Sequence, residues 1–92
     1  MGHEISEANV KLDKIKIDHK NAQSLLCHLD EILILVEDRN PDILCISETW
    51  LLPYVDDKFI SIPNFYVFRH DKGKGGGVCI YVREFFKCSQ NH

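Results

Sequence analysis

The feature that most constrains the fold is a short continuous apolar run, Ile-Leu-Cys-Ile, at residues 43–46. Such a run is typical of a strand buried on both faces of a sheet. Residues 14–18 alternate charged and apolar side chains and predict an earlier strand. Between them, residues 25–39 predict an amphipathic helix whose apolar stripe is formed by Leu25, Leu29, Ile32, Leu33 and Val36. Strand, helix and strand in this order predict a right-handed βαβ unit with parallel strands.

Residues next to this helix predict where it begins and ends. The polar residues 19–23 are expected to connect the first strand to the helix, and Ser24 is expected to cap its first turn. Asp30 and Glu31 lie near the predicted start and Arg39 near the end, as the helix dipole favours. Asn40-Pro41 is expected to end the helix, because the residue before proline avoids the helical region.

The second half of the chain predicts a hairpin. Residues 51–64 contain prolines and aspartates and are expected to form a long surface connection. Two strands are predicted at 65–69 and 77–83, and the glycine-rich stretch between them predicts a turn, so the strands should pair antiparallel. The predicted fold class is therefore α/β (α+β), a βαβ unit followed by an antiparallel β-hairpin.

Length and composition narrow the function classes. The chain has 92 residues, enough for one small domain, and a net charge of −3, which argues against a stand-alone nucleic-acid binder with a basic stripe. Its four cysteines show no CxxC spacing, so free thiols are expected rather than a zinc site. The polar first residues and the lack of a long apolar run predict a nuclear or cytoplasmic protein that is not secreted and has no membrane partner.

Three stretches together resemble one family: NAQSLLCHLDEI at 21–32, NPDILCISETWL at 40–51 and YVFRHDKGKGGGVCIYVRE at 66–84. Their order and spacing resemble the start of the endonuclease/exonuclease/phosphatase superfamily, also called DNase I-like. Within it they look most like the endonuclease of non-LTR, LINE-type retrotransposons of the jockey and related kinds. The resemblance implies the N-terminal half of a DNase I-like β-sandwich, with a flexible leader at 1–13, a partial domain at 14–86 and a tail at 87–92.

Two residues carry the chemistry that this resemblance implies. Taken alone, Glu48 is a carboxylate at a strand end and Asn21 is a turn residue. In the family, the glutamate of the E-T motif is a catalytic Mg²⁺ ligand, and an asparagine after the first strand belongs to the catalytic pocket. The predicted βαβ unit agrees with this, because the carboxyl ends of parallel strands meet at one edge of a sheet.

The resemblance also implies DNA as a partner, with weaker expectations for individual contacts. Gln23 stands where the retroelement pattern usually has arginine, so it keeps hydrogen-bonding capacity without charge. Arg69, Lys72 and Lys74 are further candidates for phosphate contacts. The glycine run at 73–77 is not a phosphate-binding Walker motif, because no Gly-Lys-Ser/Thr opens a helix there; its glycines are expected to serve the turn.

Two functions remain open from the sequence. The first is a truncated N-terminal segment of a Mg²⁺-dependent DNA endonuclease derived from a retrotransposon. The family's catalytic tyrosine, D-x-N pair and terminal Asp-His pair come from later chain, so this chain is expected to be inactive alone. The alternative is a non-enzymatic retroelement remnant acting as a small interaction protein. In either case an exposed apolar sheet face is expected to favour self-association.

Overall fold

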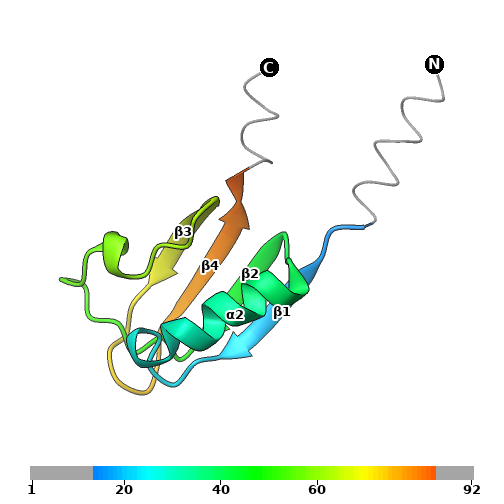
Figure 1. Ribbon diagram of the computed structural model, residues 1–92. Coiled ribbons are helices and arrows are strands. Elements are labelled where there is room, and N and C mark those ends of the chain that lie inside the picture. Colours follow the sequence, from blue (N-terminus) through cyan, green and yellow to red (C-terminus); the bar gives the residue numbers. More distant parts are fainter. Residues whose placement is uncertain (1–13, 85–92) are drawn as a thin grey trace, which may run out of the picture.

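The computed structural model describes residues 14–84, so the predicted leader at 1–13 and tail at 87–92 lie outside the described residues. One four-stranded sheet, in the order β1-β2-β4-β3, carries a single α-helix on one face (Figure 1). The elements are β1 (Ile17–Asn21), the one-turn 3-10 helix η1 (Leu26–His28), α2 (Leu29–Arg39), β2 (Ile43–Ser47), the 3-10 helix η2 (Asp57–Phe59), β3 (Phe65–His70) and β4 (Val78–Arg83).

The predicted topology is confirmed. Strands β1 and β2 pair in parallel from Ile17–Ile43 to Asn21–Ser47, with α2 as the crossover. Strands β3 and β4 form the antiparallel hairpin, and β4 also pairs antiparallel with β2. This second pairing places β2 in the interior of the sheet, as its apolar sequence predicts.

The predicted bounds of the first strand are wrong: it was expected at 14–18 and lies at 17–21. Residues 19–21 pair with β2 instead of forming a connection, whereas Lys16 closes the ladder with its carbonyl, which accepts from the N–H groups of Asp42 and Ile43. Backbone pairing does not depend on side-chain polarity. Because β1 is an edge strand, its polar side chains reach solvent and cost little.

The helix starts later than predicted and without the expected cap. Ser24 has a positive φ of 88° and lies before η1, so it caps nothing, and α2 begins after His28 with no side-chain cap bond. The end is as predicted. Asn40 adopts the left-handed conformation, with φ 50°, and its N–H donates to the Val36 carbonyl at 2.8 Å.

The hydrophobic core lies on the sheet face that α2 covers. Leu44 and Ile46 of β2 and Tyr81 of β4 are buried there against Leu25 and Ile32. The prediction that 43–46 is buried on both faces is wrong, because the alternate residues of β2 are only half-buried. No second layer of described residues covers the other face.

The connection at 51–64 is mostly exposed, as predicted, but three of its apolar residues also contribute to this core. Leu51, Ile60 and Ile62 are all buried. The hydroxyl of Tyr81 donates to the Ile60 carbonyl at 2.6 Å, which satisfies a buried polar atom on each partner. Prolines and aspartates predict the turns of such a segment but not that it folds back over a sheet.

Arg69 on β3 fastens the connection to the sheet. Its guanidinium donates to the carbonyls of Leu52 and Val55 and to the carboxylates of Asp57 and Asp71, at 2.6–3.2 Å. The side chains of Arg69 and Asp71 are 13% and 11% exposed. The N–H groups of this planar guanidinium therefore hold the connection against the strand.

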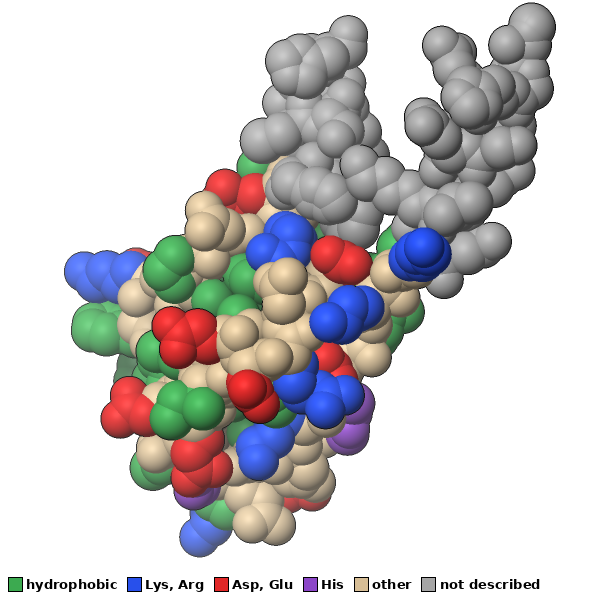
Figure 2. Space-filling model, turned by 45° about the vertical axis from the view of Figure 1, so that its right-hand side comes forward, with side chains coloured by type: hydrophobic (Ala, Val, Ile, Leu, Met, Phe, Trp, Pro, Cys, Tyr) green, Lys and Arg blue, Asp and Glu red, His purple; other side chains and the backbone are tan. Residues whose placement is uncertain are grey.

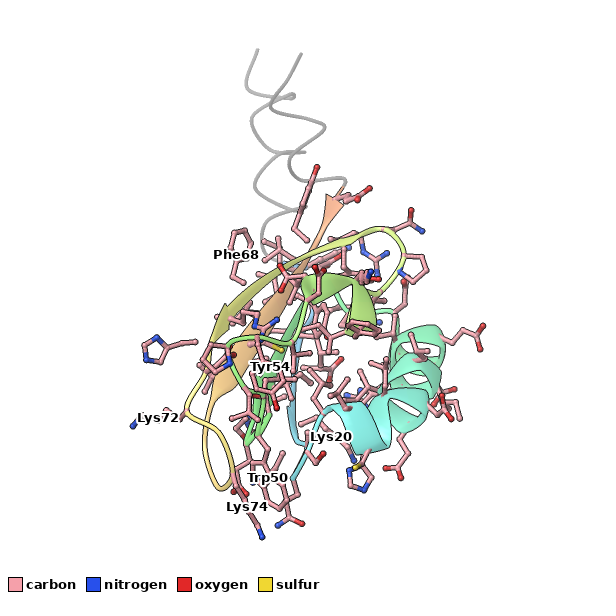
Figure 3. All side chains as sticks on the ribbon, turned by 90° about the vertical axis from the view of Figure 1, so that its left-hand side faces the viewer. Lys20, Trp50, Tyr54, Phe68, Lys72 and Lys74 are labelled. Atoms are coloured by element: carbon pink, nitrogen blue, oxygen red, sulfur yellow. The ribbon has the colours of Figure 1, made fainter. Side chains whose placement is uncertain are left out.

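The opposite sheet face is open and apolar. Ile17, Phe68, Val78 and Ile80 point to this side and are 39–64% exposed. Figure 3 shows Phe68 on the far side of the sheet from α2. On the side drawn in Figure 2, by contrast, acidic and basic side chains alternate with scattered apolar ones. Other exposed apolar side chains, such as Ile34 on α2 and Tyr54 in the connection, lie outside the sheet.

Candidate active site

Strand pairing brings four residues into one row at an edge of the sheet. Asn21 pairs with Ser47, Ser47 with Val78, and Val78 with His70. Paired residues point to the same face, so all four lie on the open side. With strands about 4.8 Å apart, the row spans roughly 14 Å. One end of every strand therefore contributes to the same stretch of surface.

Glu48 is the first residue after β2 and lies next to Ser47 of this row. The Asn21 amide Nδ2 donates to the Glu48 carboxylate Oε2 at 2.7 Å, so the two predicted catalytic side chains lie in contact. Glu48 has a φ of 52°, a left-handed conformation that is uncommon for glutamate. Strain of this kind, of about 1–3 kcal/mol, persists only where surrounding structure holds the residue.

The surrounding structure is a set of backbone bonds that join three loops. Ala22 and Ser24 donate their N–H groups to the carbonyls of Ser47 and Glu48. On the other side, Thr49 donates to Gly77 at 3.2 Å and Trp50 to Gly76 at 2.9 Å. The turn after Glu48 is therefore held by the β1–η1 loop on one side and by the glycine turn on the other.

Gly77 is the tightest point of this arrangement. It has a φ of 92°, and a Cβ added there would lie 2.5 Å from the buried Thr49 Oγ1. Only glycine allows the turn to approach this closely. The sequence predicted that the glycines serve the turn; the structure adds that one of them also makes room for the residue next to Glu48.

A shallow cleft of about 490 Å³ lies on the open face beside Glu48, lined by Ser47, Glu48, His70, Lys72, Gly76, Gly77 and Val78. Lys72 and His70 line the same cleft as the Glu48 carboxylate. Sequence analysis did not single out His70 or Ser47. Both lie within the stretches 40–51 and 66–84, but only the strand register shows that they share a row with Asn21.

The remaining predicted contact residues divide between two sides of the molecule. Gln23 is exposed in the loop next to Glu48, and Lys74 is exposed in the glycine turn. Figure 3 shows Lys72 and Lys74 around this turn. Arg69 faces the covered side of the sheet, where its guanidinium bonds to the connection. Its contact with DNA stays a prediction that the site geometry does not support.

The donor set fits a hard cation such as Mg²⁺. Mg²⁺ binds one or two carboxylates, keeps several waters and takes substrate phosphate oxygens as further ligands. Glu48 supplies one carboxylate, and the Asn21 amide orients it from one side. Residues 14–84 contain no group of three His, Cys, Asp or Glu side chains that could hold a metal by themselves. The site therefore suits a cation that shares its ligands with substrate and water.

Burial makes Cys79, on β4 beneath this site, a poor nucleophile. Loss of solvation raises the pKa of its thiol to about 12 from the ordinary 9.0. At pH 8 its thiolate fraction should be about a thousandfold lower than that of an unperturbed cysteine. The neutral thiol is favoured in the folded state, so its contribution to stability is complete below pH 9 and is lost as the pH rises toward 12.

We therefore expect iodoacetamide at pH 8 to modify the exposed Cys27 quickly and Cys79 only after unfolding. Peptide mass spectrometry with and without denaturant measures both sites in one sample, with Cys27 as the internal control. Equal rates for the two thiols without denaturant would contradict the burial of β4.

The family model described as the Endonuclease/Exonuclease/phosphatase family matches residues 8–92. The chain belongs to this family. No curated protein sequence matches the chain.

Solved structures resemble the described fold. An AP endonuclease from Archaeoglobus fulgidus is 29% identical, with a TM-score of 0.56, over 74% of this chain and 27% of that one. The 3′ phosphatase NExo from Neisseria, bound to product DNA hairpin, is 26% identical, with a TM-score of 0.60, over 75% and 27%. An AP endonuclease of Leishmania major is 22% identical, with a TM-score of 0.62, over 74% of this chain and 23% of that one. At this identity the similarity supports the fold alone.

The mixed α/β architecture therefore matches part of a DNase I-like fold, as the sequence predicted. The chain spans about a quarter of the length of these solved structures. Within residues 14–84, no helix is long and apolar enough to cross a membrane.

Proposed function

We propose that this chain carries the first part of a Mg²⁺-dependent phosphodiesterase site that hydrolyses DNA. The observation that carries the proposal is the 2.7 Å contact between Asn21 and Glu48 at the carboxyl ends of two parallel strands. Ligand sites of α/β sheets lie at this position. Family membership and the nuclease and phosphatase structures that the fold resembles support the same chemistry.

In this proposal Glu48 holds the cation and Asn21 fixes the carboxylate. A bound Mg²⁺ would neutralise charge that develops on the phosphate and the leaving oxygen. The Asn21 amide keeps one carboxylate oxygen hydrogen-bonded, so the other stays directed toward the cation. Lys72 lies in the same cleft and is suited to a phosphate oxygen of the strand. Gln23 and Lys74 extend the contact to either side.

We further propose that the parent protein is the endonuclease of a LINE-type, non-LTR retrotransposon. The motifs ISETWL at 46–51 and GKGGGVCIYVR at 73–83 support this origin. In that setting the natural substrate is a chromosomal DNA strand that is nicked. Such a protein would work in the nucleus after synthesis in the cytoplasm.

A second candidate function has an observation of its own. The open sheet face exposes Ile17, Phe68, Val78 and Ile80 together, and contiguous apolar surface of this kind marks interaction sites. A non-enzymatic remnant would use this face to bind a protein partner or a second copy of itself. Sedimentation of the 92-residue chain over a concentration series distinguishes this candidate: a monomer at all concentrations contradicts self-association.

The metal site can be tested without any activity. Manganese ion replaces Mg²⁺ and broadens the NMR signals of nearby nuclei, so weak binding is detectable. We expect broadening centred on the backbone amides of Asn21, Ala22 and Glu48. In Glu48→Gln the side chain keeps its shape and can still accept from Asn21, but it loses its charge, so this broadening should disappear.

Glu37→Gln, at an exposed acidic position on α2, is the matched control and should leave the broadening unchanged. Broadening that survives Glu48→Gln, or that centres on other carboxylates, would refute the metal site.

We also expect the 92-residue chain alone to leave supercoiled plasmid intact in the presence of Mg²⁺. Hydrolysis needs a positioned base and a stabilised transition state, and the described site supplies one carboxylate and one amide. Gel electrophoresis against a buffer control measures nicking. Nicking that Glu48→Gln abolishes would show that the chain is a complete nuclease and overturn this prediction.

A further inference from the structure

Trp50 stands two residues beyond Glu48, in an unusual environment. Its backbone has a φ of 58°, and its N–H donates to the Gly76 carbonyl, so the residue is held against the glycine turn. The side chain is partly buried. Its indole Nε1 is enclosed, and no residue of the described chain accepts its hydrogen bond.

This arrangement is the reverse of the usual one. A tryptophan at a protein surface normally turns its N–H toward water or a partner and buries its carbon surface. Here the polar atom points inward, at a cost of about 1–3 kcal/mol for an unpaired buried donor. The part of the indole that solvent reaches is therefore carbon. Such a surface suits stacking and not hydrogen bonding.

Positive charge lies next to this surface. Lys74 and Lys72 belong to the turn that bonds to Trp50, and Figure 3 shows Trp50 and Lys74 at the same end of the molecule. An aromatic surface beside lysines is the combination that single-stranded nucleic acid binds: bases stack on the ring and phosphates contact the cations. The adjoining cleft at Glu48 adds a place for a phosphate.

We propose that Trp50 is a stacking platform for an unpaired nucleobase of the DNA strand whose phosphate contacts Lys72 in the cleft beside Glu48. The proposal rests on the proposed function, since it takes DNA as the ligand. It adds that the site prefers a base outside a duplex, either in a single strand or turned out of a helix. Within a duplex, stacking on the neighbouring bases would hide the face of the base that the indole contacts.

The chain contains one tryptophan, so intrinsic fluorescence reports this residue alone. The test titrates the 92-residue chain, in EDTA, with two oligomers of equal length: oligothymidylate and an abasic sugar-phosphate chain. Both carry the same charge and only the first has bases. We expect oligothymidylate to quench Trp50 and the abasic oligomer to bind weakly without quenching. The corresponding duplex should quench little.

Affinity is then measured by the anisotropy of labelled oligomers. Stacking contributes about 1–3 kcal/mol per base, so Trp50→Leu should weaken oligothymidylate binding roughly 5- to 150-fold and leave abasic binding unchanged. Trp50→Phe should keep part of the affinity, which separates lost stacking from lost folding. Phe59→Leu, at an exposed aromatic residue of η2 outside the cleft lining, is the matched control and should change neither affinity.

Each outcome decides between the two proposals. Binding of both oligomers with equal affinity and no quenching overturns the stacking platform and leaves the phosphate contacts of the proposed function in place. Binding of neither oligomer overturns the platform and the DNA contacts together. Because the titration contains EDTA, its result does not depend on the cation at Glu48, which the manganese experiment tests separately.

Discussion

Replacing Arg69 by methionine is expected to remove most of the free energy of unfolding at 25 °C. The guanidinium is 13% exposed and joins two carboxylates and two carbonyls, so its loss leaves Asp71 charged, nearly buried and without its cation. Removing one member of a buried pair costs about 3–5 kcal/mol. The free energy of unfolding of a small domain is only about 5–15 kcal/mol, and a domain with an uncovered sheet face is expected near the lower value.

Urea unfolding followed by circular dichroism measures this loss. Arg39→Met is the matched control, because Arg39 also bonds an aspartate at 2.8 Å but its side chain is 62% exposed. An exposed pair contributes about 0–1 kcal/mol, so this variant should stay folded. Arg69→Lys should fall between the two, since it keeps the charge and loses the planar fork. Equal stability of the Arg69 and Arg39 variants would refute the role of Arg69 as the fastening residue.

Gly77→Ala is the second change with a large expected effect. The added Cβ would lie 2.5 Å from Thr49 Oγ1, and alanine is strained at a φ of 92°. Backbone strain costs about 1–3 kcal/mol and overpacking a further 1–3 kcal/mol. The clash falls on the residue next to Glu48, so we expect both lower stability and loss of the manganese broadening at Glu48.

Gly75→Ala separates the two causes. Gly75 has a φ of 84° but no atom within 4 Å of an added Cβ, so this variant should show the strain without the clash. Thr49→Ala removes the hydroxyl and should restore part of the stability of Gly77→Ala. If Gly75→Ala and Gly77→Ala prove equally unstable, the close approach to Thr49 has no role in holding the Glu48 turn.

The site itself illustrates how much local sequence can predict. The motifs identify Asn21 and Glu48, and the βαβ pattern predicts that both lie at the same edge of the sheet. The 2.7 Å hydrogen bond between their side chains confirms this position. Their catalytic roles stay predictions. His70 and Ser47 join the same row through strand register alone. No short-range signal marks them, because register is set by the pairing of distant segments.

The elements of the fold can likewise be separated into those that local sequence predicts and those that depend on contacts between distant segments. Apolar periodicity determined the helix, the apolar run at 43–46 determined the interior strand, and the glycine run determined the hairpin, because each depends on spacing along the chain. The first strand was misplaced, since its residues 19–21 are polar and only pairing with β2 makes them a strand. The helix start was misplaced for a similar reason. The loop at 22–25 bonds to residues 47–49, and Ser24 lies there with a φ of 88°, outside the extended conformation that a helix N-cap needs.

The sequence by itself therefore determined which segments become helix and strand and which side chains carry the candidate chemistry. Tertiary structure alone decided which sheet face is covered, how the connection at 51–64 packs, and what Arg69 and Trp50 contact. The physical reason is the sequence separation over which each effect acts. Propensity and periodicity act over a few residues, whereas burial, buried ion pairs and close approaches such as Gly77 to Thr49 arise only when distant segments meet.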